Sequence, residues 1–333
     1  MEPVRFGVIS TAKIGLEKVI PAMQQSQLCR IVGIGSRDLG RAEAAARALG
    51  IARAYGSYAE LLEDPEIEAV YNPLPNHLHV PVSIQAAAAG KHVLCEKPIA
   101  LTAEEAAKLI AARDHAGVLI QEAFMIRQHP QWRRARELVH AGRIGELRAV
   151  QGSFSYMNLD PRNVRNQAGI GGGGLYDIGC YPIVAARFLF AAEPTRAIGQ
   201  IEYDPDFETD RLASVLLEFP AGQALFVCST QLVPYQRMQI FGTQARIEIE
   251  IPFNAPPDRP CRILVDDGSD RGGGSAQIES FETVDQYTLQ ADAFARAIRT
   301  GAPLEFPLED AVRNMRVLDA VYRSGLSGRW EPV

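Results

Sequence analysis

Residues 4–15 read Val-Arg-Phe-Gly-Val-Ile-Ser-Thr-Ala-Lys-Ile-Gly. The first six form an apolar, β-rich run, which predicts a buried strand. A short turn follows, then a helical pattern to about residue 23, and then a second apolar run at residues 31–35. Because strand, tight turn, helix and strand in this order form a βαβ unit, we expect a parallel sheet.

The turn after the first predicted strand lies where dinucleotide-binding folds place Gly-x-Gly-x-x-Gly. Ser10 and Ala12 stand at the first two glycine positions, and only Gly15 is retained. Small side chains still let backbone N–H groups approach a pyrophosphate at a helix N-terminus. We therefore expect dinucleotide contacts from five residues of this turn: Ser10, Thr11, Ala12, Lys13 and Ile14.

The end of the second predicted strand indicates which dinucleotide is bound. NAD enzymes commonly carry Asp or Glu about 20 residues past the glycine turn, where the carboxylate binds the ribose 2′-hydroxyl. This chain has Ser36 and Arg37 there, with Arg41 one helical turn later. Because a guanidinium group offers forked donors to phosphate oxygens, the pattern favours NADP over NAD. The alternative is that both arginines are solvated helix charges.

Two later strands of the same predicted sheet also end in polar residues. In an open parallel sheet, ligands bind beyond the carboxyl ends of the strands. The strand at residues 92–95 ends in Glu96-Lys97-Pro98, so Lys97 is expected to face a ligand; an ordinary surface charge pair is the alternative. The strand at residues 69–71 runs into a proline-rich turn. From these two strand ends we expect four further cofactor contacts besides Lys97: Leu74, Asn76, His79 and Glu96.

The spacing of His77 and His79 is compatible with a metal site. No Cys or carboxylate cluster completes such a site, so we expect no bound metal.

Long strand patterns predominate after residue 147, and two helices close the chain. The expected strands are at residues 147–156, 197–203, 213–219, 224–232, 239–241, 247–251 and 278–284; the helices are at 288–299 and 308–323. The fold class is thus α/β, with an N-terminal Rossmann sheet, doubly wound and parallel, plus a C-terminal α+β domain whose large open sheet is mainly antiparallel. We expect nucleotide binding in residues 1–123, and substrate binding and oligomerisation in residues 124–333, with a C-terminal helix able to pack back on the first domain.

Residues 171–182 contain the second informative motif, Gly-Gly-Gly-Gly-Leu-Tyr-Asp-Ile-Gly-Cys-Tyr-Pro. Asp177 and Tyr181 are four residues apart at the start of a predicted helix, so they share one helix face. The glycines allow a close approach of the backbone to a ligand. The alternative is an acid favoured by the helix dipole and a core tyrosine.

Composition and charge indicate which kinds of binding partner and compartment to expect. The net charge is −6 with no block of Lys or Arg, which argues against nucleic acid. No apolar run reaches the length of a membrane span. The N-terminal residues have no signal-peptide layout, and the five cysteines are scattered, which fits reduced thiols in a cytoplasm.

Taken together, these motifs resemble the glucose–fructose oxidoreductase/inositol dehydrogenase (Gfo/Idh/MocA) family along almost the whole chain. The resemblance implies a Rossmann domain followed by an α/β domain whose open sheet commonly forms the subunit interface, hence a homodimer or homotetramer. Many members have histidine where this chain has Tyr181. Tyrosine there resembles the branch with glucose–fructose oxidoreductase, NADP-dependent D-xylose dehydrogenase and dimeric dihydrodiol dehydrogenase.

The resemblance implies hydride transfer between NADP and a sugar or polyol, with an aldose such as xylose or glucose favoured. Tyr181 would be the acid/base, and Asp177 would anchor a sugar hydroxyl. A free tyrosine has a pKa near ~10, which a nearby ammonium lowers, so Lys97 would be its electrostatic partner and would also bind the substrate oxygen. The family also suggests a cis peptide at Pro98. Three residues before the glycine run are further candidates for the substrate pocket: Tyr156, Arg162 and Arg165.

Other functions remain open at this stage. A reductase of ketosugars or a trans-dihydrodiol oxidoreductase would use the same residues. A cofactor-sensing regulator would keep the fold without turnover, although the presence of both Lys97 and Tyr181 argues against it.

Overall fold

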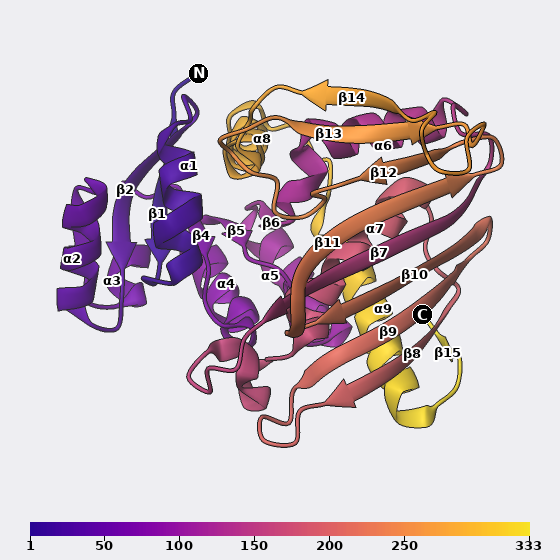
Figure 1. Cartoon of the computed structure of the whole chain (residues 1–333). Coiled ribbons are helices and arrows are strands. Elements are labelled where there is room, and N and C mark those ends of the chain that lie inside the picture. The colour runs from indigo at the N-terminus through magenta and orange to yellow at the C-terminus, as the bar shows by residue number, and fades with distance from the viewer. The chain divides into compact units, whose positions relative to one another are not determined.

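The computed structural model describes residues 1–333, and the chain divides into two structural units (Figure 1). The first comprises residues 1–125 and 287–315, and the second comprises residues 126–286 and 316–333. Helix α8 (Gln286–Thr300) therefore belongs almost wholly to the first unit, and helix α9 (Leu308–Ser327) has residues in both.

The first unit contains a six-stranded sheet in the order β3-β2-β1-β4-β5-β6, and every neighbouring pair is parallel. The predicted Rossmann sheet is thus confirmed. Its strands are β1 (Val4–Ile9), β2 (Cys29–Gly35), β3 (Arg53–Tyr55), β4 (Ala69–Asn72), β5 (His92–Cys95) and β6 (Ile120–Glu122). Its helices, besides α8, are α1 (Ile20–Gln24), α2 (Leu39–Leu49), α3 (Tyr58–Glu63), α4 (His79–Ala88) and α5 (Ala103–Ala116).

Strand β1 is the topological switch point of this sheet, because β2 and β4 flank it on opposite sides. The crevice beyond the carboxyl ends of β1 and β4 is where such sheets bind ligands. Apolar residues of β1 are fully buried, and Phe6 lies 6.4 Å from Phe294 of α8 between ring centroids. Arg299 of the same helix forms a 2.7 Å ion pair with Glu68 beside β4, which anchors this late helix to the early sheet.

The second unit contains a nine-stranded sheet in the order β14-β13-β12-β11-β7-β10-β9-β8-β15 (Figure 1). Only β7 and β10 pair in parallel, so the predicted, mainly antiparallel sheet is confirmed. Its strands are β7 (Leu147–Met157), β8 (Arg196–Tyr203), β9 (Asp210–Phe219), β10 (Gly222–Ser229), β11 (Gln231–Gly242), β12 (Arg246–Ile249), β13 (Cys261–Asp266), β14 (Gln277–Phe281) and β15 (Glu331–Pro332). Helices α6 (Pro130–His140) and α7 (Cys180–Phe190) pack on one face, beside the later turns of α9.

One strand prediction in this sheet is wrong. The apolar run at residues 224–232 forms two strands, because β10 ends at Ser229 and β11 begins at Gln231. Both strands pair with β7, on opposite sides of it. At Thr230 the chain therefore crosses from one side of β7 to the other. The prediction also omitted β13, an apolar strand between two irregular segments.

The remaining global features concern membranes, metals and thiols. None of the helices is both long enough and apolar enough to cross a membrane. No group of three or more His, Cys, Asp or Glu side chains is placed to hold a metal ion. All five cysteines are buried and unpaired with one another.

Candidate functional site

The turn after β1 resembles a dinucleotide-binding turn in its backbone geometry, although Ser10 replaces the first glycine. Ser10 has a φ of +85°, in the left-handed region that glycine normally occupies. Its N–H donates to the Gly35 carbonyl (2.9 Å), and its Oγ accepts from the Ala12 N–H (3.2 Å). A Cβ on Gly15 would lie 3.7 Å from the Tyr71 ring, so the turn packs closely against β4. The turn can therefore present backbone N–H groups at the end of β1.

The loop after β2 and the first turn of α2 contain two arginines and one aspartate, whose carboxylate accepts a hydrogen bond from the helix backbone. Arg37 and Arg41 are exposed, and both interact electrostatically with Tyr58, partly offsetting the burial that raises the pKa of Tyr58. Asp38, the nearby acid, caps helix α2 by accepting from the Arg41 N–H (3.2 Å). Ser36 is buried, and its Oγ accepts from the Asp38 N–H (3.2 Å). The two exposed guanidinium groups can donate to the oxygens of a phosphate group.

His79 holds together the loops that follow β4 and β5. Its Nδ1 lies 2.7 Å from the Pro98 carbonyl oxygen and its Nε2 lies 2.6 Å from the Leu74 carbonyl oxygen. Burial lowers the pKa of this imidazole to about 4. Because both ring nitrogens face main-chain oxygens, the ring supports the loops from within. Any role of His79 toward a dinucleotide would come through the position of Leu74 and Asn76.

The Glu96-Lys97-Pro98 segment is held by three side chains of the first unit. Tyr71 donates its hydroxyl to Glu96 Oε1 (2.8 Å), and burial together with Glu96 raises the pKa of Tyr71 well above its usual range. The Lys97 N–H donates to Glu96 Oε2 (3.3 Å), and the Lys97–Pro98 peptide is cis, as the resemblance implied. Beyond it, Glu122 of β6 accepts from the Ile99 N–H (2.8 Å). The half-buried Lys97 thus starts from a fixed backbone.

In the second unit, Asp177 is the centre of a polar cluster. Its Oδ2 accepts from the Tyr156 hydroxyl (2.6 Å) and from Arg165 Nε (2.7 Å). Burial and the Asp177 carboxylate raise the pKa of Tyr156, and the same carboxylate raises that of Arg165. Two donors on one oxygen orient the Asp177 carboxylate and identify it as a hydrogen-bond acceptor.

Tyr181, four residues later, is set in an aromatic environment. Its ring lies 5.8 Å from Phe154 in an edge-on arrangement and 5.4 Å from Phe253, and these two phenylalanines stack at 4.8 Å. The Tyr181 side chain is buried, and Arg165 interacts with it electrostatically. Arg165 therefore interacts with both Asp177 and Tyr181.

Phe253 was not among the predicted site residues, although side chains distant in sequence hold its segment in place. Gln131 and Trp132 of α6 donate to the carbonyls of Ile251 and Pro252 at 2.9 and 2.6 Å. Gln286 donates to the Phe253 carbonyl (3.0 Å), and Gln236 of β11 accepts from the Phe253 N–H (2.9 Å). Nothing in the local sequence at residue 253 indicates a ring that packs on Tyr181.

The glycine run is anchored by Asp210, which was also not predicted. Asp210 Oδ2 accepts from the Leu175 N–H (2.6 Å), and a Cβ on Gly173 would lie 2.0 Å from Oδ1. Gly173 has a φ of +117°, which L side chains rarely adopt. The run therefore needs glycine because it passes over a buried carboxylate.

Three predicted residues lie apart from these groups. The Arg162 side chain is 89% exposed and pairs with Asp160, so the structure does not bring it to Asp177. Lys13 is 84% exposed, so only its backbone belongs to the turn. Ile14 packs against the hydrophobic core of the first unit.

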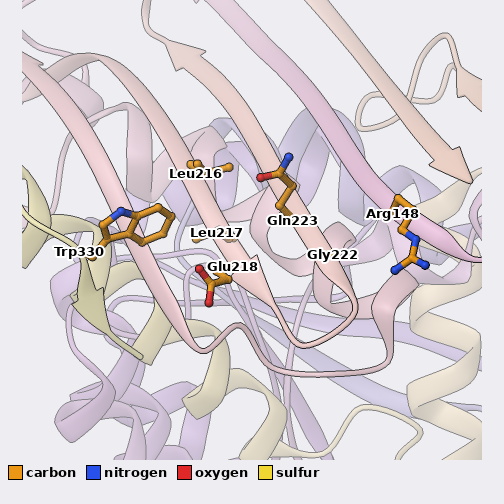
Figure 2. Close-up of a pocket in the computed structure, with 7 residues that line it drawn as sticks. All are labelled: Arg148, Leu216, Leu217, Glu218, Gly222, Gln223 and Trp330. Atoms are coloured by element: carbon orange, nitrogen blue, oxygen red, sulfur yellow. The ribbon is translucent and has the colours of Figure 1, made fainter.

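One hollow on the second unit involves none of the predicted residues. It lies beside the hairpin between β9 and β10, and its lining includes Trp330, Leu216, Glu218, Gln223 and Arg148 (Figure 2). Arg196 stacks on the Trp330 ring at 4.6 Å and pairs with Glu218 at 2.6 Å.

Comparison with known proteins connects this geometry with a family. Residues 4–124 match the Gfo/Idh/MocA oxidoreductase family with its NAD-binding Rossmann fold, and residues 132–248 match the Gfo/Idh/MocA C-terminal domain. An uncharacterized oxidoreductase of Rhizobium meliloti is 54% identical, and the alignment covers 100% of both chains.

Two further relatives have named activities. The NADP-dependent D-xylose 1-dehydrogenase 2 of Haloferax volcanii is 39% identical, with 97% of this chain and 98% of that protein covered. A 3-ketoreductase from Actinomadura kijaniata, solved with NADP and TDP-benzene, is 29% identical with a TM-score of 0.90, over 97% of this chain and 98% of that one. The chain therefore belongs to the Gfo/Idh/MocA family of NAD(P)-dependent oxidoreductases.

Proposed function

We propose that this protein is an NADP-dependent sugar oxidoreductase in which Tyr181 is the acid/base. The observation that carries the proposal is the Asp177 cluster, where Tyr156 and Arg165 orient a carboxylate and Arg165 also interacts with Tyr181. A fixed carboxylate acceptor beside a phenol suits a substrate with adjacent hydroxyl groups. The D-xylose dehydrogenase relative supports an aldose such as xylose or glucose.

A second candidate is the reduction of a ketosugar carried on a nucleotide. The 3-ketoreductase relative, which was solved with NADP and TDP-benzene, favours it. The two candidates share the same residues and differ in the direction of proton transfer at Tyr181, so an assay with both substrate types distinguishes them.

The cofactor supplies the hydride chemistry, and the protein supplies binding, orientation and proton transfer. We expect the turn at residues 10–14 to bind the pyrophosphate and Arg37 with Arg41 to bind the 2′-phosphate. In the oxidative direction, Tyr181 takes the proton of the reacting hydroxyl. Asp177 accepts from a neighbouring sugar hydroxyl and so fixes which carbon reacts.

The cofactor assignment predicts a higher kcat/KM with NADP than with NAD. Replacing Arg37 with Ala removes a charge-assisted contact, so we expect the KM for NADP to rise about tenfold while that for NAD stays near its starting value. Arg47→Ala, on the helix α2 that follows Arg37 and 72% exposed, is the matched control. A clear preference for NAD in the unmodified protein would contradict the assignment.

The acid/base assignment predicts that Tyr181→Phe lowers kcat by about two to four orders of magnitude, because a positioned acid/base contributes that much. The variant keeps the ring that packs on Phe154 and Phe253, so NADP binding, measured by fluorescence titration, should persist. The assay follows nicotinamide absorbance with aldoses, dihydrodiols and nucleotide-linked ketosugars. Near-normal turnover of the variant would refute the role of Tyr181. Bound NADP without turnover of any substrate would instead favour a regulatory protein.

We further propose a homodimer or homotetramer formed through the outer face of the nine-stranded sheet. Along β10, Leu225 and Val227 alternate with buried residues and are each 37% exposed. Leu216 of β9 pairs with Leu225 in register, which extends the apolar surface across two strands.

A further inference from the structure

Hydrogen bonds fix the backbone of Arg165, although the residue lies between the regular elements β7 and α7. Its carbonyl oxygen accepts from the Gly173 N–H (2.8 Å), and its own N–H donates to Asn163 Oδ1 (3.1 Å). A Cβ on Gly172 would lie 2.7 Å from the Arg165 carbonyl oxygen, so the glycine run packs directly on this residue. The backbone is therefore fixed before the side chain makes any contact.

The guanidinium group is directed at the Asp177 carboxylate rather than at solvent. Nε lies 2.7 Å from Asp177 Oδ2, although the side chain is 41% exposed and could extend outward. Arg162, three residues earlier, shows the alternative, since it is 89% exposed and pairs with its neighbour Asp160. The two arginines of one loop thus have different partners.

The proposed reaction creates an electrostatic problem at this position. When Tyr181 is deprotonated, its phenolate carries a negative charge four residues along the chain from the Asp177 carboxylate. Like charges at this spacing repel each other. In the second unit, Arg165 on the preceding loop interacts electrostatically with Tyr181 and also pairs with Asp177. Asp177 in turn accepts a hydrogen bond from Tyr156 on β7. Phe154 and Phe253 surround the ring without adding charge.

We propose that Arg165 is a positioning residue that acts as the counter-ion of Asp177, so that Tyr181 can ionise beside a carboxylate. This inference rests on the proposed role of Tyr181. Asp177 then keeps its charge for accepting a substrate hydroxyl, while the Arg165 guanidinium cancels the field of that charge at the Tyr181 oxygen. A neutral side chain at position 165 would remove this ion pair from the carboxylate.

The test is the pH dependence of Arg165→Met. We expect the limb of the kcat profile that reports deprotonation of the base to move to higher pH by about one unit or more, because loss of a nearby opposite charge shifts titrations by this amount. NADP affinity should change less than twofold. Arg165→Lys should recover part of the shift, and Arg162→Met should leave the limb unmoved.

A double variant separates charge compensation from folding. In Arg165→Met combined with Asp177→Asn, the unbalanced carboxylate is gone, so the limb should return toward that of the unmodified protein even if kcat stays low. A limb that is unmoved in Arg165→Met, with a uniform fall in kcat, would overturn the inference.

A readout without turnover distinguishes this inference from the proposed function. The ultraviolet difference absorbance of phenolate, compared with Tyr181→Phe, follows ionisation of Tyr181 in NADP-saturated protein. A titration that moves to higher pH in Arg165→Met supports the counter-ion role whether or not the substrate is known, and an unmoved titration overturns it. Full activity of Tyr181→Phe would refute the proposed function instead.

Discussion

Asp210 has a buried side chain that its sequence position does not indicate. It begins a strand in a polar segment, yet it is only 2% exposed. Its carboxyl accepts from the Leu175 N–H and from the Tyr322 hydroxyl (3.0 Å), and burial raises its pKa to about 7. A residue more than 30 positions from the glycine run thus decides whether the run can adopt its path.

This raised pKa predicts a pH-dependent stability. Between about pH 4 and pH 7 the folded state keeps a proton on Asp210 that the unfolded chain has lost. The resulting stabilisation is fully present below the unfolded pKa and is lost as pH rises through the folded pKa of about 7. Comparing urea unfolding at pH 5 and pH 8, we expect the unmodified protein to lose about 2 kcal/mol more than Asp210→Asn. Parallel profiles for the two proteins would contradict this assignment.

At the scale of elements, the sequence patterns that involve only neighbouring residues predicted the structure best. Strand β1 and the beginning of α9 were predicted at their observed residues. Thr102 caps α5 by accepting from the Glu105 N–H (3.1 Å), and Gly117 ends that helix with a φ of +66°. The Glu105 carboxylate accepts from the Leu101 N–H (3.2 Å), one residue before the cap, so the two residues form a capping box in shifted form. These interactions span a few residues, and local sequence therefore contains them.

Elements that depend on distant partners were predicted less well. Whether the run at residues 224–232 is one strand or two depends on β7, which receives β10 on one side and β11 on the other. The helix predicted from residue 176 is also divided, because Leu175–Gly179 forms a π-helical turn before α7 begins at Cys180. Such wide turns are frequent at functional sites, and this one contains Asp177.

At the scale of the whole molecule, the proposed oligomer gives a test on the outer sheet face. Val227→Asp combined with Leu225→Asp places two charges on a surface that we expect to be apolar and covered. We expect sedimentation velocity to report smaller species than for the unmodified protein, with unchanged circular dichroism. Leu326→Asp, at a residue of α9 that is 83% exposed and off the sheet, is the control. A monomeric unmodified protein would refute the proposed interface.

The sequence by itself determined the class of both sheets and the family, because periodicity and short motifs are local properties of the chain. It also indicated Lys97, Asp177 and Tyr181 as candidates, since each lies within a recognisable motif. Only the tertiary structure decided that Arg165, and not Arg162, pairs with Asp177, and that Phe253 and Asp210 support the site. Those outcomes depend on burial and on contacts between segments far apart in the chain, which no local pattern encodes.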